Sequence, residues 1–225
     1  MVITTTNQAM LRIMQLSSVS LPVGGYAFSQ GMEYAIETGW VTKQQQVADW
    51  TALQLTQSLA RVDLPVLRLA MDAWGTQDEG RIVELNDLVL ACRETKELRL
   101  NDTAMGEALA RLLRSLEIPT PFVRLEDISF VVLFAIAAKH WQIDYDTAAL
   151  GFAWSWLENQ IAAATKLVPL GQTQAQKLLG KLQPVLMEAI TLADQLDEDD
   201  IGAGLPAVAI ASCLHETQYS RLFRS

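Results

Sequence analysis

The sequence holds few cysteines and histidines, the residue types that most often bind transition metals. Among 225 residues it has only two cysteines, Cys92 and Cys213, and only two histidines, His140 and His215. Two thiols so far apart in the chain form neither a disulfide framework nor a zinc site, and they favour a reducing, cytoplasmic environment. A tight metal site usually needs more ligands than such a set can bring together.

Targeting and membrane-spanning segments are also lacking. No basic stretch followed by a long apolar one stands at the start, so no secretory signal is expected. The longest nearly unbroken apolar run, Ile128 to Ala138, is shorter than the roughly 20 residues that a bilayer-spanning helix needs. Lys139 and His140 close this run, which we predict to be a buried core helix.

Positive charge is in short supply as well. Lys and Arg number 17 against 26 Asp and Glu, which gives a formal net charge of −9. Such a chain repels a phosphate backbone, so nucleic acid is not expected as a partner. Hydrophobic residues make up 50% of the sequence and charged residues 19%, a composition that folds around a core.

No nucleotide-hydrolysis motif is present. Gly180-Lys181 is not followed by Ser or Thr and lacks the upstream glycine of a phosphate-binding loop. Ser29, with Gly31 two residues on, resembles the nucleophile elbow of serine hydrolases, but that elbow joins a strand to a helix within a sheet. We therefore expect Ser29 to be the N-cap of a helix through residues 32–36. A hydrolase stays as an alternative that a purely helical fold would remove.

Two clusters could attract a cation. Cys213 and His215 lie two residues apart, and such positions do not face each other on a helix. We prefer a core thiol beside a capping or interface histidine, and keep the pair as the metal candidates of this sequence. The acidic run Asp197 to Asp200 lacks the ligand spacing of a calcium loop and is predicted to be a solvated surface turn.

Hydrophobic periodicity predicts an all-α fold. Apolar residues recur every three or four positions along most of the chain, whereas no run of alternating apolar and polar residues predicts a strand. Three such stripes are Ala48-Ala52-Leu55-Leu59-Val62, Ile82-Leu85-Val89-Cys92 and Met105-Leu109-Leu112-Leu116. No linker or internal repeat divides the sequence. We predict one domain over residues 1–225, a bundle of about nine or ten helices.

Capping residues and prolines set the predicted boundaries. Thr42 and Asp144 are the expected N-caps of two helices. The segment Leu150–Ala164 is apolar on every side, which is typical of a bundle centre or an oligomer interface, and Pro169 follows its end. Pro184 is expected either to split or to kink the next helix.

Two segments have compositions typical of binding surfaces. In residues 21–31, the paired glycines Gly24 and Gly25 allow a tight turn or the close approach of another backbone, and Tyr26 is a residue type that interfaces favour. A rigid turn packed on its own core explains them equally well. In residues 215–225, Tyr, Arg, Leu and Phe stand where chain ends are usually polar and loose. Docking on its own domain and ordering on a partner are both open, and we favour the partner.

Four motifs in chain order cover the sequence from end to end. They are Leu16-Ser17-Ser18 with Leu21-Pro22-Val23-Gly24-Gly25, Ser29-Gln30-Gly31-Met32-Glu33 and Gly39-Trp40-Val41; Cys92-Arg93-Glu94-Thr95-Lys96-Glu97-Leu98-Arg99; Lys166-Leu167-Val168-Pro169-Leu170-Gly171-Gln172; and His215-Glu216-Thr217-Gln218-Tyr219-Ser220-Arg221-Leu222-Phe223-Arg224-Ser225. Together they resemble the UreF family of urease accessory proteins. Val131 and Ala135 stand where many members have Pro and Gly, and Leu214 where an Arg often precedes the histidine. The last departure argues against an essential basic residue at that position.

The resemblance implies a function that composition alone does not show. Members of this family are all-helical dimers that bind a second accessory protein, UreD (also called UreH), and with it recruit the GTPase UreG. The assembly acts on apo-urease and helps to install its nickel centre. The resemblance implies no catalysis and no tightly bound cofactor, with nickel passing through the assembled complex. The alternative is a nickel chaperone that holds the metal itself through Cys213 and His215.

On this resemblance we assign roles to residues as hypotheses. Gly24, Gly25 and Tyr26 would lie at the dimer interface. The tail of residues 218–225, flexible in the free protein, would become ordered against UreD. Its contact residues would be Tyr219, Arg221, Leu222 and Phe223.

A second set of residues is expected to face UreG. Lys166 is a lone charge among apolar neighbours, and Glu94, Glu97 and Arg99 could share its surface. Two simpler explanations stay open. Lys166 near a helix C-terminus complements the helix dipole, and the other three could form surface pairs three residues apart.

Overall fold

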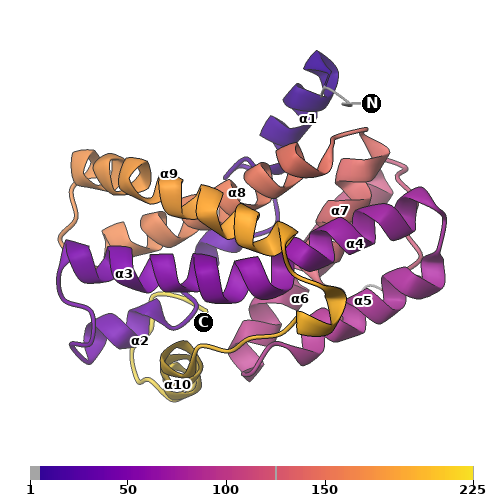
Figure 1. Cartoon of the computed structure of the whole chain (residues 1–225). Coiled ribbons are helices and arrows are strands. Elements are labelled where there is room, and N and C mark those ends of the chain that lie inside the picture. The colour runs from indigo at the N-terminus through magenta and orange to yellow at the C-terminus, as the bar shows by residue number, and fades with distance from the viewer. Residues whose placement is uncertain (1–5, 125, 225) are drawn as a thin grey trace.

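Every regular element in the described part of the chain is helical, which confirms the predicted all-α fold. The computed structural model describes residues 6–124 and 126–224, and these ranges contain no strand. Their α-helices are α1 (Asn7–Leu16), α2 (Met32–Glu37), α3 (Gln44–Gln54), α4 (Leu64–Gly75), α5 (Glu79–Ala91), α6 (Lys96–Ser115), α7 (Phe130–His140), α8 (Tyr145–Leu167), α9 (Gln172–Asp194) and α10 (Pro206–His215). Three shorter elements are η1 (Gly25–Ala27), η2 (Leu55–Asp63) and η3 (Glu198–Asp200). Figure 1 shows their arrangement.

The core is built around α7. All residues from Phe130 to Ala138 are buried, which confirms the core helix predicted from the apolar run. This helix packs mainly against α4 and α6. Phe134 meets Phe152 of α8 edge to face, with ring centroids 5.2 Å apart, an arrangement that aromatic rings prefer. No helix in the described part of the chain combines the length and apolarity that a membrane crossing requires.

One long rod is formed by α3, η2 and α4. The middle element, η2, is a π-helix, in which each turn holds more residues than an α-helical turn. The predicted stripe holds at Ala48, Leu55, Leu59 and Val62, which are all buried. The π-helix also buries the carboxylate of Asp63, which the stripe did not include. The rod runs across the molecule in Figure 1, from α3 to α4.

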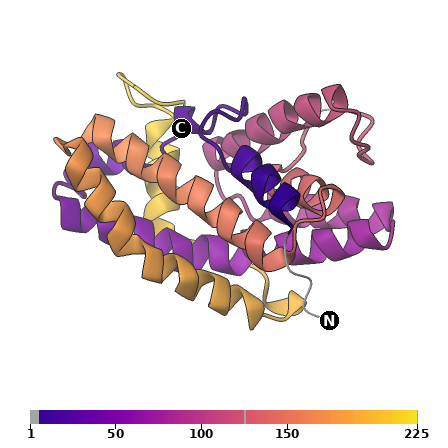
Figure 2. The same ribbon diagram turned by 90° about the horizontal axis from the view of Figure 1, so that it is seen from above.

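The helices α8 and α9 pack side by side after a short connection (Figure 1, Figure 2). Asp144 is the N-cap of α8, as predicted, and its Oδ1 accepts a hydrogen bond from the Thr147 amide at 2.8 Å. Pro184 does not split α9, which continues through it as one helix. Much of α8 is buried, as expected for a bundle centre, whereas Leu150 is exposed; the alternative of an oligomer interface stays a prediction.

Two predicted N-caps are shifted. The N-cap of α3 is Lys43 rather than Thr42, because the Gln46 side chain reaches back and accepts from the backbone amides of both residues. The N-cap of α2 is Gly31 rather than Ser29, since the chain turns through the left-handed region at Gly31, with φ of 80°. Ser29 still contributes, because its hydroxyl accepts from the Glu33 amide in the first turn of α2.

Candidate functional site

The C-terminal segment returns to its own domain. After α10 the chain runs back to η1 and α2, so that its last described residues lie beside α2 and α10 (Figure 1). Phe223 is only 5% exposed, and the Arg224 amide donates to the Ala27 carbonyl at 2.8 Å. The structure thus shows residues 218–224 docked on their own domain, and the expectation that a partner orders this tail stays a prediction. Ser225, the last residue of the predicted tail, lies outside the described residues.

Glu33 in the first turn of α2 holds the returning chain. Its carboxylate is buried and accepts hydrogen bonds from the backbone amides of Leu222, at 2.7 Å, and Phe223, at 2.9 Å. Bonds to a charged acceptor are stronger than those between neutral groups. The position also suits the negative charge, because the amino end of a helix carries a partial positive charge.

His215 at the end of α10 connects Glu33 to Glu97. Its ring is fully buried, with Nδ1 2.8 Å from Glu97 Oε2 and Nε2 3.0 Å from Glu33 Oε2. Both contacts are hydrogen bonds when the ring is a doubly protonated imidazolium, because each carboxylate oxygen is an acceptor. Arg221 donates to the second Glu97 oxygen at 3.1 Å. We call Glu33, Glu97, His215 and Arg221 the latch cluster, in which two carboxylates face an imidazole ring and a guanidinium group.

The latch cluster changes the interpretation of the metal candidates. Both ring nitrogens of His215 are engaged by carboxylates, whereas Cys213 is exposed on α10. The two side chains are therefore not brought together on one ion. Within residues 6–124 and 126–224, no group of three or more His, Cys, Asp and Glu side chains is arranged to hold a metal.

Lys166 lies against the docked tail. Its ammonium is 5.3 Å from the centroid of the Phe223 ring, within the range of a cation–π interaction. The guanidinium of Arg224 lies 5.6 Å from the ring of Phe28 in the same way. Two predicted motifs, at the end of α8 and at the C-terminus, are thus parts of one surface.

The tail keeps some side chains exposed. Tyr219 is fully exposed and Leu222 is 74% exposed, although Glu33 holds the Leu222 amide and Tyr219 lies only two residues before Arg221. Tyr26 of η1, on the segment that Arg224 contacts, is 63% exposed. Large apolar or amphipathic side chains exposed on an ordered backbone are typical of protein interfaces.

The two predicted interface glycines have different surroundings. Gly24 has φ of 75°, a left-handed conformation that glycine adopts most easily. A Cβ added at Gly25 would lie 3.0 Å from Asn159 Nδ2 and 3.2 Å from Met105 Cε. The close approach that Gly25 permits is thus to its own chain, and Tyr26 is the member of this set that faces outward.

The remaining three predicted residues do not share one surface. Glu97 is buried in the latch cluster, so it cannot contact a protein partner directly in this conformation. Arg99 donates to Asp127 at 3.2 Å and to the Leu90 carbonyl at 3.1 Å, rather than to a residue three positions away. Glu94 is exposed and lines a recess beside the motif.

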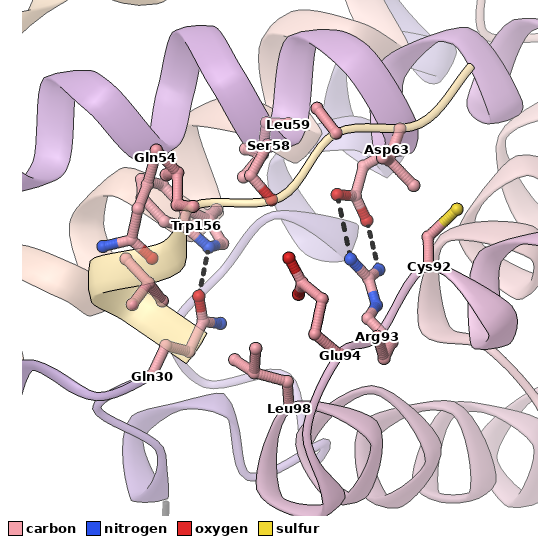
Figure 3. A pocket seen from close by; sticks show the side chains of 14 residues that line it. Gln30, Gln54, Ser58, Leu59, Asp63, Cys92, Arg93, Glu94, Leu98 and Trp156 are labelled. Carbon is pink, nitrogen blue, oxygen red and sulfur yellow. Dashed lines mark hydrogen bonds and ion pairs between the residues drawn. The ribbon is translucent and has the colours of Figure 1, made fainter. Parts of the chain in front are cut away.

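That recess contains a buried ion cluster that sequence reasoning missed (Figure 3). Arg93 donates to both carboxylate oxygens of Asp63, at 2.5 and 3.3 Å, and to Asp102 at 2.9 Å. Asp102 also accepts from the Ser129 hydroxyl and the Phe130 amide, at the start of α7. The cluster thereby connects η2, the middle motif, α6 and the core helix.

Burial and charge act in opposite directions within this cluster. Burial raises the pKa of Asp63 above its ordinary value, and Arg93 offsets only part of that rise. Burial alone would lower the pKa of Arg93, but Asp63 and Asp102 raise it above its ordinary value. Nearby, burial raises the pKa of the Cys92 thiol. On the opposite wall Trp156 Nε1 donates to Gln30 Oε1 at 3.0 Å.

Comparisons with known proteins agree on one family. The family model UreF matches residues 41–183 of this chain. A urease accessory protein UreF from Marinomonas sp. (strain MWYL1) is 71% identical over 223 residues, which cover 99% of this chain and 97% of the relative. Proteins of the same name from Hahella chejuensis and Alkalilimnicola ehrlichii are 49% and 46% identical, and each alignment covers at least 96% of both chains.

Proposed function

Because the chain belongs to the UreF family of urease accessory proteins, we propose that it is a non-enzymatic scaffold in urease maturation. In this proposal it binds UreD (UreH), recruits the GTPase UreG to the assembly, and supports the insertion of nickel into apo-urease. The metal is cargo of the assembled complex rather than a ligand of this chain. A direct nickel chaperone that uses Cys213 and His215 is disfavoured by the two carboxylates that engage His215.

One observation supports a binding role above the others. The C-terminal segment is fastened by the latch cluster and yet leaves Tyr219 and Leu222 exposed. Side chains held on an ordered backbone lose less conformational entropy on binding than those of a free tail. We therefore assign UreD binding to Tyr219 and Leu222. Arg221 and Phe223, which we expected to contact the partner, would act indirectly by holding the segment in place.

The other assignments follow from exposure. Lys166 and Glu94 remain the candidates for the contact with UreG, because both are exposed. Arg99 is a weaker choice, since it is engaged with Asp127. Tyr26 is the candidate for a dimer contact, with Gly24 and Gly25 shaping its turn.

The test is capture of partners from cells that co-express UreD, UreG and apo-urease. The tagged full chain is compared with a chain that ends at Thr217 and with the double variant Tyr219→Ala/Leu222→Ala. A matched control is Leu53→Ala, because Leu53 is also an exposed leucine, at 53%, but lies on α3. We expect the full chain and the control to capture UreD and UreG, and the other two to lose both while keeping their helical circular dichroism. Capture of UreD by all four chains would refute the role of the tail.

A further inference from the structure

The latch cluster presents more hydrogen-bond acceptors than one neutral imidazole ring can serve. Nδ1 of His215 lies 2.8 Å from Glu97 Oε2, and Nε2 lies 3.0 Å from Glu33 Oε2. A neutral ring carries one N–H and one lone pair, and an ionised carboxylate has lone pairs only. Two hydrogen bonds at these distances need two protons. The closed cluster therefore holds one proton more than a neutral ring with two ionised carboxylates.

The other hydrogen bonds of the cluster favour the ring as the place of this extra proton. Glu33 accepts from the backbone amides of Leu222 and Phe223. Glu97 accepts from the guanidinium of Arg221. Hydrogen bonds to the ionised form of a carboxyl group stabilise that form. With the proton on the ring, two negative groups meet two positive ones, whereas a neutral ring would leave a net negative charge in a buried site.

Each element packed around the ring supplies one of these charged groups. Helix α10, which carries the ring, packs on α2 and α6, and these helices provide Glu33 and Glu97. The returning tail provides Arg221. Lys166 and Arg224, the other cations of this surface, lie over aromatic rings instead. The residues that the structure describes make no further hydrogen bond or ion pair to the ring.

We propose that docking of the C-terminal segment is a proton-dependent switch, closed while the His215 ring carries two protons and opened when it loses one. Without the second proton, a ring nitrogen and a carboxylate oxygen would face each other with lone pairs at 2.8 or 3.0 Å. The carboxylate that withdraws from the ring also gives up a tail contact, because Glu33 holds two tail amides and Glu97 holds Arg221. Loss of the ring proton therefore releases the segment.

The direction of the switch follows from the proton count. A histidine exposed to water loses its proton at about pH 6.5. Above that pH the docked form binds one proton more than the released form, so the equilibrium constant for docking falls by up to about tenfold for each pH unit. The fall ends where the docked form loses its proton as well. The segment is thus docked near neutral pH and released in alkaline solution.

This switch controls how the exposed side chains of the tail are presented. Tyr219 and Leu222 are held on an ordered backbone only while the segment is docked. Under the proposed function, capture of the partner protein therefore weakens as the pH rises. The inference about docking itself rests on the latch cluster alone and does not depend on that function.

The test follows the ring and the tail by NMR on the full chain, labelled with ¹³C and ¹⁵N, between pH 6 and 9. Nitrogen shifts of an imidazole report whether the ring holds one proton or two. Carbon-detected nitrogen shifts of Leu222 and Phe223 report docking and survive fast amide exchange. The sequence has only two histidines, so the exposed His140 is the internal reference, and His140→Gln assigns its signals. The variant is His215→Gln, whose amide neither gains nor loses a proton in this range.

The expected result is a shared titration. At pH 7.5 the His215 ring holds two protons while His140 holds one. At higher pH the Leu222 and Phe223 nitrogens leave their docked shifts at the pH where the His215 ring loses its second proton. In His215→Gln these two shifts are independent of pH.

Two results would overturn the proposal. One is a His215 ring that is neutral at pH 7.5 while both tail nitrogens keep their docked shifts. The other is loss of the second ring proton without any movement of the tail nitrogens. Both are read from the wild-type chain, so the test stands even where His215→Gln fails to fold. Failure of the proposed function is distinguished by the capture experiment, which is carried out at one pH.

Discussion

Removal of the Glu33 carboxylate should release the C-terminal segment while leaving the helices in place. Its two oxygens accept from the amides of Leu222 and Phe223 and lie against His215. Glu33→Ala removes all three contacts at once. Release of the segment lets the two amides bind water, but His215 stays buried with only Glu97 beside it.

The magnitude follows from the burial of this charge. Removal of one partner from a buried, hydrogen-bonded ion pair costs about 3–5 kcal/mol, so we expect Glu33→Ala to lower the free energy of unfolding by about that amount. Glu33→Gln keeps one acceptor oxygen for the Leu222 amide but presents an amide to Phe223. Its cost should be nearer 1–3 kcal/mol, the value of one lost bond to a charged group. Glu188→Ala on the exposed face of α9 is the control, with an expected change within about 0.5 kcal/mol.

Two assays separate the release of the tail from general destabilisation. Urea unfolding followed by circular dichroism gives the free energy of unfolding. Amide hydrogen exchange by NMR, under conditions where each variant is folded, reports on Leu222 and Phe223 directly. We expect both amides to lose protection in Glu33→Ala and to keep it in Glu188→Ala. If Glu33→Ala unfolds at the wild-type urea concentration with both amides still protected, the latch cluster does not hold the tail.

The remaining predictions concern buried ion pairs, two glycines, the two cysteines and the partly buried carboxyl of Glu158 on α8. Arg93→Ala should lower the free energy of unfolding, measured in urea, by about 3–5 kcal/mol, because it leaves Asp63 and Asp102 buried without their cation. The control Arg99→Ala, which breaks the exposed pair with Asp127, should cost under about 1 kcal/mol. Equal costs for the two variants would contradict this account of the recess. Gly106→Ala should abolish folding or lower the free energy of unfolding by about 3 kcal/mol or more, since its Cβ would overlap the Ile128 carbonyl. Gly180→Ala, whose Cβ would lie in open space, should raise the free energy of unfolding by up to about 1 kcal/mol. Cys92 should react with iodoacetamide more slowly than the exposed Cys213 between pH 7 and 9, because burial raises its pKa; mass spectrometry of the two peptides after timed quenching measures the ratio. Burial raises the pKa of Glu158 in the folded chain, so ionisation of this carboxyl opposes folding once the pH rises above the unfolded pKa of about 4.3. The melting temperature of Glu158→Gln should therefore be higher than that of the wild type at pH 7 but not at pH 4. A difference in melting temperature that is independent of pH would argue against burial as the cause.

Much of the fold is predictable from the sequence because local patterns and tertiary packing agree. The uninterrupted apolar run has no polar side chain to place at a surface, so its burial as α7 follows directly from composition. Asp144 is a good N-cap whatever packs around it, because the bond that it makes is local. The prediction of Thr42 and Ser29 as N-caps is wrong. In α3 the side chain of Gln46 bonds back to the chain and Lys43 becomes the N-cap, and in α2 the left-handed conformation of Gly31 makes that glycine the N-cap.

The candidate site was predicted less well because it depends on contacts between distant residues. The composition of the tail predicts a binding segment. Whether it binds its own domain, however, depends on Glu33, nearly 190 positions earlier in the chain. The same holds for Arg93 and Asp63, which are partners across 30 positions. A charged residue on the buried side of an otherwise apolar stripe, such as Asp63, is the signal that could have predicted the cluster.

The π-helix η2 also limits how the length of this chain can change. A π-helical stretch accommodates an extra residue within a helix without breaking it. The helix that follows, here α4, is rotated about its axis relative to the helix that precedes it, here α3. Deletion of a single residue between Leu55 and Asp63 would allow ordinary helical geometry, but it would turn α4 about its axis by about 100° relative to α3. The apolar side of α4 would then leave α7, and the carboxylate of Asp63 would leave Arg93. Among homologues that keep both contacts, insertions and deletions should therefore be absent from this stretch and confined to connections such as residues 116–124.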